Sequence, residues 1–196
     1  MNRDEIIKIL KDKLELNVAL HSIALEICMG AIYDYLKING KLKENDPSKE
    51  SWLKAGLLHD IDYGGKYKED HCYKTQEALD EYGLSVSPEE MRIIKAHAPM
   101  RTNILPENNA EWAIYCADSL TGLIVAVTLV YPSKKLAEVK LSSVLKRFHK
   151  DPKFASGTRR EEVKKCENPE GLNIPIDTFI EICFEAMKNN AQEIEL

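Results

Sequence analysis

Histidine and aspartate recur within or directly beside apolar segments of this chain, where ionisable side chains are costly. The chain has five histidines, and four of them have an apolar or small neighbour within a segment of helical character. His59 and Asp60 follow the apolar run Leu57-Leu58, and Asp118 lies in the most apolar segment of all. Burying an imidazole or a carboxylate is unfavourable unless the group is paired or bound to a metal. Each residue alone fits an ordinary hydrogen-bonded core side chain, but together they indicate a site.

The set as a whole has the composition of a transition-metal site. Imidazole suits Zn, Fe, Mn, Co or Ni better than Mg or Ca. A carboxylate such as Asp60 can bridge two ions, and a two-metal site can activate a shared water and bind a phosphoryl group. We therefore expect one or two divalent transition metals, with the candidate ligands His21, His59, Asp60, His71, His97 and Asp118.

Helices must position these residues, because apolar residues recur at helical spacing and no segment shows sustained strand alternation. The predicted fold class is therefore all-α. Ser87 with Glu90, and Thr158 with Glu161, have the spacing of capping boxes at helix starts. We predict helices at about 3–16, 18–39, 49–59, 71–82, 88–97, 109–131, 138–149, 158–167 and 175–192.

Length and composition fit one domain. The chain has 196 residues, of which 44% are apolar and 30% charged, an ordinary globular composition. We predict a single domain over residues 1–196, with a core at about 15–150 and a C-terminal helical appendage at about 151–196. The net charge of −5 argues against a nucleic-acid duplex as the partner. The sequence sets no oligomeric state.

Cysteine usage and the N-terminal segment predict a cytoplasmic protein. The five cysteines are odd in number and form no CxxC pair, so neither a disulfide framework nor a cysteine zinc site is expected. The charged N-terminal segment lacks the apolar core of a signal peptide. Residues 112–131 are long enough to span a bilayer, but Asp118 would cost about 2.5–3.5 kcal/mol there. We predict a core helix for this segment and no membrane partner.

The order of these residues resembles the HD-domain superfamily of metal-dependent phosphohydrolases. His21, then His59-Asp60, then Asp118 resemble its H…HD…D signature. The flanking words A-L-H-S-I-A-L-E, G-L-L-H-D-I-D and A-I-Y-C-A-D-S-L-T-G-L-I are similar to its motifs. K-E-D-H-C-Y-K-T-Q-E-A-L and I-I-K-A-H-A resemble segments that donate additional histidines in dinuclear members. Most of residues 15–190 is similar to a bacterial and archaeal group of predicted HD-superfamily hydrolases.

This resemblance implies an HD-type helical bundle with the metal site in its core. By position, His71 and His97 would complete a second metal site, and the basic metal set would be His21, His59, Asp60 and Asp118. The chain departs from the HD-GYP subgroup, because H-D-I-D-Y-G-G replaces H-D-I-G-K. Hydrolysis of cyclic di-GMP is therefore not specifically indicated.

The predicted function is hydrolysis of a phosphoester in a small phosphorylated metabolite, with a nucleotide as the first choice. A metal would lower the pKa of a bound water, and the resulting hydroxide would attack phosphorus. Asp60 and Asp62 are the catalytic candidates; Asp62 could orient the water, act as general base or merely cap a helix end. Arg101 and Lys74 are the candidates for binding the substrate phosphate, and the other basic residues, including Arg159, are expected to be solvated.

Two other functions fit the same residues. The domain could bind a metal and a nucleotide as a sensor module with little turnover. Some HD-type proteins with two irons carry out oxygen-dependent chemistry, so a di-iron oxygenase is the other alternative.

Overall fold

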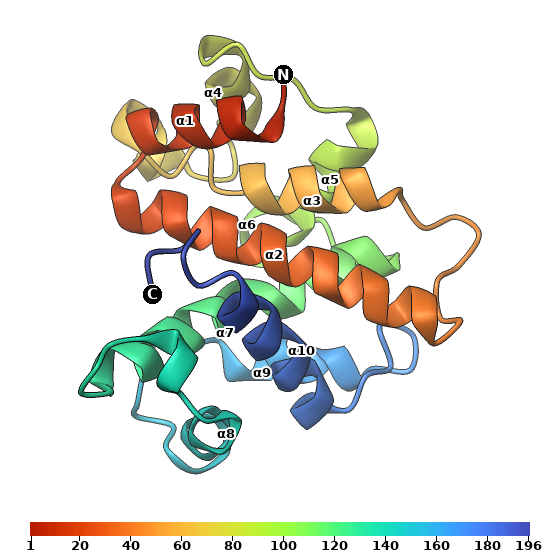
Figure 1. Ribbon diagram of the computed structural model, residues 1–196. Coiled ribbons are helices and arrows are strands. Elements are labelled where there is room, and N and C mark those ends of the chain that lie inside the picture. Colours follow the sequence, from red (N-terminus) through yellow and green to blue (C-terminus); the bar gives the residue numbers. More distant parts are fainter.

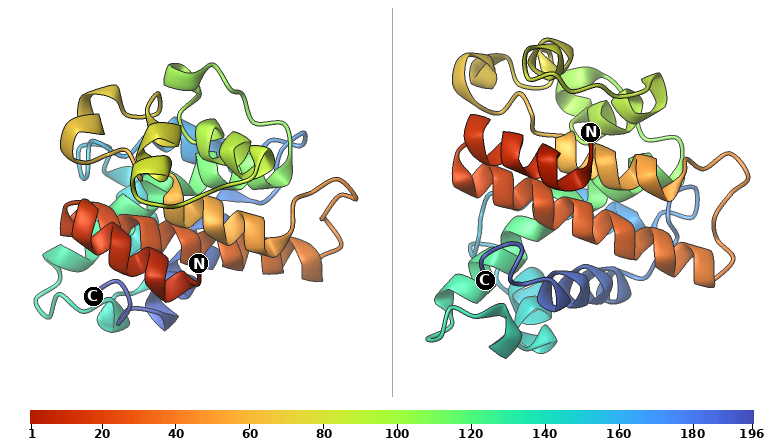
Figure 2. Two further views of the ribbon diagram at one scale, coloured as in Figure 1. Left: turned by 90° about the horizontal axis from the view of Figure 1, so that it is seen from above. Right: turned by 45° about the horizontal axis from the view of Figure 1, so that its top comes forward.

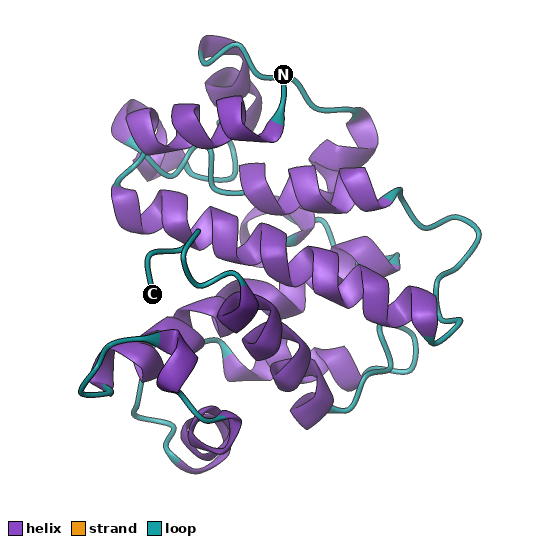
Figure 3. Ribbon diagram, viewed as in Figure 1, coloured by secondary structure: helices purple, strands orange, loops and turns teal.

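Helices form the whole regular framework of the protein. The computed structural model describes residues 1–196 and contains helices but no β-strand (Figure 3). The predicted all-α fold class is confirmed. The longer helices are α1 (Arg3–Lys13), α2 (Leu16–Ile38), α3 (Lys49–Leu58), α4 (Thr75–Glu81), α5 (Pro88–Ala96), α7 (Asn109–Val130), α8 (Leu141–Lys150) and α10 (Ile176–Asn189). The short ones are the 3₁₀ helices η1 (Gly65–Asp70), η2 (Leu136–Glu138) and η3 (Lys164–Glu167), with α6 (Pro99–Thr102) and α9 (Arg160–Val163).

The helix α2 crosses the middle of the molecule, and α1, α3, α7 and α10 pack against it (Figure 1). The helix α3 lies along one side of α2, while α7 and α10 contact α2 from the other side. The segment from η1 to α6, yellow to green, lies on the α3 side of α2 in the right-hand view of Figure 2, and its helix α5 packs against α3. The helix α5 of that segment also contacts α7, so α2, α3, α5 and α7 converge in the interior.

One continuous apolar core includes side chains from both ends of the chain. Leu10 of α1, Ile32 of α2, Ile124 of α7 and Phe184 of α10 are all buried in it. The helix α10 contributes to this core because it packs against both α2 and α7. The C-terminal helices, which we predicted as an appendage, therefore share the core of the main body.

Two helices, α2 and α7, are long and apolar enough to cross a membrane by length and composition. In each, 61% of the most apolar window is buried inside the fold. This is a weak indication of a membrane span, because the core helix of a soluble protein has the same length and composition. The burial of α7 agrees with the core helix that the sequence predicts.

Of the two capping boxes predicted from the sequence, one forms and the other does not. The predicted capping box of Ser87 and Glu90 forms at the start of α5. The predicted box of Thr158 and Glu161 does not, because α9 begins later and the Glu161 carboxylate accepts a hydrogen bond from Lys164 Nζ at 2.7 Å. The helix predicted from about residue 71 begins only at Thr75, since the preceding residues form a turn in the part of the chain that reaches the site.

Gly56 allows α3 to approach α2 closely. A Cβ atom at this position would lie 3.0 Å from the backbone Cα of Glu26 in α2, closer than packed atoms tolerate. The helix α3 therefore ends directly beside α2. This brings His59, the residue after α3, within 3.1 Å of His21.

Candidate metal centre

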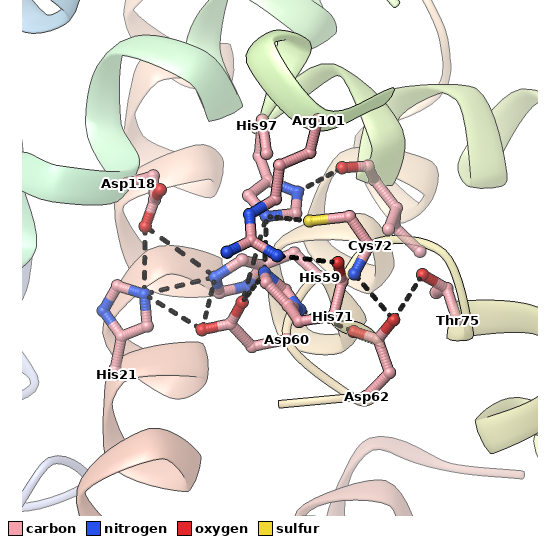
Figure 4. A network of polar contacts seen from close by, with 12 residues as sticks. His21, His59, Asp60, Asp62, His71, Cys72, Thr75, His97, Arg101 and Asp118 are labelled. Carbon is pink, nitrogen blue, oxygen red and sulfur yellow. Dashed lines mark hydrogen bonds and ion pairs between the residues drawn. The ribbon is translucent and has the colours of Figure 1, made fainter. Parts of the chain in front are cut away.

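Four of the predicted ligands meet where α3 ends beside α2 and α7 (Figure 4). His21 Nε2 lies 3.1 Å from His59 Nε2 and 3.0 Å from Asp118 Oδ1. Asp60 Oδ2 lies 3.3 Å from His59 Nε2 and 3.7 Å from His21 Nε2. Metal–ligand bonds of about 2.0–2.2 Å separate two ligands of one ion by about 2.8–3.6 Å. The donor atoms of His21, His59 and Asp118 are thus grouped closely enough that they could hold one metal ion, and Asp60 lies beside them.

The other two predicted ligands form a second group on the opposite side of Asp60. His71 Nε2 lies 3.4 Å from His97 Nε2. Asp60 Oδ1 lies 3.4 Å from His71 Nε2 and 3.9 Å from His97 Nε2. Asp60 therefore turns one carboxylate oxygen toward each group of histidines (Figure 4).

His59 and His97 are fixed by the ends of the helices that carry them. Each directly follows its helix, where the last carbonyls lack intrahelical partners. His59 Nδ1 bonds to the Gly56 carbonyl at 2.9 Å, and His97 Nδ1 bonds to the Ile94 carbonyl. Because a carbonyl only accepts hydrogen bonds, each Nδ1 carries a proton, and a neutral ring then keeps a free lone pair on Nε2.

His21 and His71 are held in the same way by side chains. His71 Nδ1 lies 2.7 Å from Asp62 Oδ1, a carboxylate acceptor. His21 Nδ1 lies 2.9 Å from the Thr121 hydroxyl, which donates its own proton to the Asp118 carbonyl at 2.7 Å. Thr121 must then accept from His21. All four histidines thus use Nδ1 on a protein acceptor and present Nε2 to the carboxylates, an arrangement typical of metal ligands.

The Nε2 atoms of His21 and His59 lie 3.1 Å apart, and each would present a lone pair to the other. Two lone pairs at this distance repel each other unless a positive charge, a proton or a metal ion, lies between them. Burial lowers the pKa of His59, but Asp60 and Asp118 outweigh burial and raise it to about 9. Burial alone would raise the pKa of Asp60, yet the positive charge on His59 holds it below its usual range. Burial and the charge on His59 lower the pKa of His97 to about 4, so this ring is neutral at pH 7.

Asp62 lies behind His71 and is fully buried. Its Oδ1 holds the His71 ring, while Oδ2 accepts hydrogen bonds from the Cys72 backbone N–H at 2.9 Å and the Thr75 hydroxyl at 3.1 Å. Both oxygens are therefore occupied by protein donors. This geometry favours positioning of His71 over the general-base role and over the helix cap that the sequence also allowed.

Substituting Asp62→Asn is expected to weaken metal binding about 10–100-fold, the usual effect of losing a carboxylate behind a ligating histidine. An asparagine amide would either face the Cys72 N–H with its own N–H group or turn that group toward His71 and force the wrong tautomer. Competition with a chromophoric chelator measures the affinity. Asp80→Asn, which changes an exposed aspartate bonded to Gln76, is the control and should leave the affinity unchanged. An unchanged affinity in Asp62→Asn would contradict the positioning role.

The two groups of ligands open into a pocket of about 440 Å³. Arg101, which the sequence suggested as a phosphate ligand, lines this pocket. Its Nη1 lies 3.4 Å from the His71 carbonyl oxygen. Tyr63 also lines the pocket and packs edge-on against the His71 ring, with centroids 4.9 Å apart. The pocket thus joins carboxylates, imidazoles, a guanidinium and an aromatic ring.

Lys74, the other predicted phosphate ligand, lies away from the pocket. It is the residue before α4, and its Nζ lies 2.8 Å from the Glu77 carboxylate on the exposed side of that helix. The later start of α4 explains the difference, because Lys74 ends a turn instead of lying within the predicted helix. The structure therefore does not bring Lys74 to the candidate site.

Arg159 is the site residue that sequence reasoning missed, since we predicted that it is solvated. It lines the pocket, and its Nη2 lies 2.5 Å from Asp118 Oδ2 while its Nε lies 2.5 Å from Glu162. Asp118 thus contacts His21 with one oxygen and Arg159 with the other. The sequence gives no local signal for this contact, because Arg159 stands in a basic, polar stretch of ordinary surface composition.

Comparisons with protein-family models, curated proteins and solved structures find no match to this chain. The HD-type resemblance is therefore an expectation from sequence motifs. What the structure adds is independent of that resemblance: the buried histidine, cysteine and aspartate groups could hold a metal ion.

Proposed function

We propose that this protein is a metal-dependent phosphohydrolase that cleaves a phosphoester of a nucleotide or another small phosphorylated metabolite. One arrangement carries the proposal. Four imidazole Nε2 atoms surround Asp60 and Asp118 with their tautomers set for metal binding, beside a pocket that contains two arginines. The motif order that resembles HD-type phosphohydrolases supports the same conclusion.

We infer two divalent transition metals, one on each side of Asp60. Mn, Fe, Zn, Co and Ni are the candidates, because imidazole nitrogen is a good ligand for these ions. When bound, such an ion supplies the hydrolytic chemistry by lowering the pKa of coordinated water toward neutrality. One position would be held by His21, His59 and Asp118, and the other by His71 and His97, with Asp60 common to both.

The pocket supplies what a phosphorylated substrate needs besides metal. Arg101 in α6 and Arg159 before α9 carry guanidinium groups, which match phosphate oxygens in a bidentate geometry. Tyr63 lines the pocket and is 38% exposed, and an aromatic ring is a suitable contact for a nucleobase. A volume of about 440 Å³ also lies within the roughly 300–1,000 Å³ of small-molecule sites. These features favour a nucleotide-sized substrate over a polymer.

We also propose a cytoplasmic location, and the state of the cysteines supports it. All five are buried and free, with no disulfide between them. Reduced thiols are typical of proteins that remain in the cytoplasm. Nucleotides and phosphorylated metabolites occur in the same compartment.

Metal binding should become weaker as the pH falls. Because the pKa of His59 is raised to about 9, this ring is protonated at neutral pH and a metal must displace its proton. Competition with one proton lowers the apparent affinity about tenfold per pH unit, so affinity should rise roughly 100-fold from pH 6 to pH 8. Titration calorimetry in buffers of different ionisation enthalpy would count the released protons. An affinity that is constant over this range would contradict a protonated His59.

The proposed activity is tested by measuring phosphate release from a panel of nucleotides and phosphorylated metabolites, with Mn, Fe, Co, Ni or Zn added separately. We expect release from at least one nucleotide that depends on the metal and stops with chelator. Oxygen uptake by the reduced di-iron form without phosphate release would favour the di-iron oxygenase. The position of Asp60 between two groups of histidines is compatible with that function too. Tight nucleotide binding without turnover would favour the sensor module.

A further inference from the structure

Cys72 differs from the other four cysteines in its surroundings. Cys28, Cys116, Cys166 and Cys183 all belong to the apolar core, where packing alone accounts for them. Cys72 is equally buried, at 3% exposure, but lies outside that core and beside the second group of histidines. Packing as a small apolar side chain in the core therefore does not account for Cys72.

The Cys72 sulfur lies close to the nitrogen donors of His71 and His97. Its Sγ is 3.7 Å from His97 Nε2, and the donor atoms of His71, Cys72 and His97 all lie within 4.8 Å of one another. Bonds of about 2.3 Å to sulfur and about 2.0–2.1 Å to nitrogen place these two ligands of a tetrahedral ion about 3.5–3.6 Å apart. The observed distance is close to that value. His71 and His97 are themselves 3.4 Å apart between their Nε2 atoms.

The backbone turns Cys72 and His71 toward the same point. Cys72 has φ of 73°, a left-handed conformation that is uncommon for a residue other than glycine. Its N–H donates to Asp62 Oδ2, while Asp62 Oδ1 holds the His71 ring (Figure 4). One buried carboxylate thus fixes two consecutive residues that would point apart in a regular helix or strand.

We propose that the Cys72 sulfur is a ligand of the metal position formed by His71, His97 and Asp60, and that this position therefore selects thiophilic ions. This inference rests on the proposed metal-dependent function. On coordination the S–H bond is broken, a sulfur–metal bond forms, and the proton passes to solvent. Thiolate ligands favour Zn and Fe or Co over Mn and Mg. The chain would thus have one position with oxygen and nitrogen donors, and a second that also has sulfur.

Cobalt substitution tests the ligand directly, without reference to activity. Wild type loaded with Co²⁺ should show visible d–d bands together with a near-ultraviolet band from sulfur-to-cobalt charge transfer. Cys72→Ser should keep the visible bands and lose the charge-transfer band. Cys166→Ser, in the apolar core, is the control and should keep both. Circular dichroism confirms that each variant is folded.

The experiment distinguishes failure of the proposed metal site from failure of the proposed sulfur ligand. If no protein sample acquires visible cobalt bands, the proposed metal site itself is wrong. If cobalt binds but wild type shows no charge-transfer band, or Cys72→Ser retains one, the sulfur ligand is overturned while the metal site stands. X-ray absorption of the zinc-loaded wild type gives an answer that needs no variant, because a sulfur neighbour at about 2.3 Å is expected. A shell of only nitrogen and oxygen would overturn the inference.

Discussion

Replacing His59 and Asp60 together by alanine is expected to remove metal binding and to lower metal-dependent phosphate release by about a thousandfold or more. Asp60 has one oxygen toward each group of histidines, so its loss affects both metal positions. A metal contributes several kcal/mol to stabilising the transition state, and each 1.4 kcal/mol is about tenfold in rate. Metal content by mass spectrometry and phosphate release by a colorimetric assay measure the two effects.

The double substitution is preferable to either single one. Removing only His59 would leave the buried Asp60 carboxylate without its positive partner, and an uncompensated buried charge destabilises a fold strongly. The matched control is His149→Ala with Asp177→Ala, which removes the same two residue types from an exposed pair 2.7 Å apart, outside the pocket. The control should retain metal and activity. Full metal content in the His59 and Asp60 variant would place the site elsewhere.

Replacing Arg159 by alanine is expected to lower kcat/KM about 100- to 1,000-fold while leaving bound metal in place. The loss of one charged donor to a developing oxyanion has this magnitude. Arg159 is the pocket cation that also contacts Asp118, at 2.5 Å, and its side chain is 47% exposed. We therefore expect the Arg159 guanidinium to bind a phosphate in the pocket while it keeps its contact with Asp118. Arg159→Lys should recover only part of the activity, because lysine lacks the planar pair of donors.

Two controls separate this effect from a general loss of positive charge. Arg147→Ala removes an arginine from a half-buried pair with Asp151, and Lys74→Ala removes a half-buried lysine that binds Glu77; neither residue lines the pocket. Both should stay within about twofold of wild type, as surface charges usually do. Steady-state kinetics with metal content measured on the same samples make the comparison. Activity near wild type in Arg159→Ala would mean that the residue only balances the charge of Asp118.

The candidate ligands could be predicted from the sequence because their signal is local. His59 and Asp60 directly follow a run of leucines, and Asp118 interrupts the most apolar helix. The all-α class followed from helical periodicity, and the start of α5 from the capping box at Ser87. Each of these features is visible within about ten residues of the chain.

The surroundings of the ligands could not be predicted, because they depend on the path of the chain. The contact of Arg159 with Asp118 joins residues 41 apart and requires the turn after α8 to return to the pocket. The role of Asp62 depends on a turn that delays the start of α4 and gives Cys72 a left-handed backbone. Neither propensity nor periodicity reports such a turn. The residues that bind and orient the ligands therefore became visible only in three dimensions.

The hydrogen bond between His21 and Thr121 joins residues 100 apart in the sequence. The ligand set is consequently complete only when the whole fold has closed, and the unfolded chain has no comparable site. An ion that binds only the native state raises the free energy of unfolding by about 1.4 kcal/mol for each tenfold excess over its dissociation constant. Differences of that size change how much protein survives degradation in cells. Metal supply would thus regulate the lifetime of this protein as well as its chemistry.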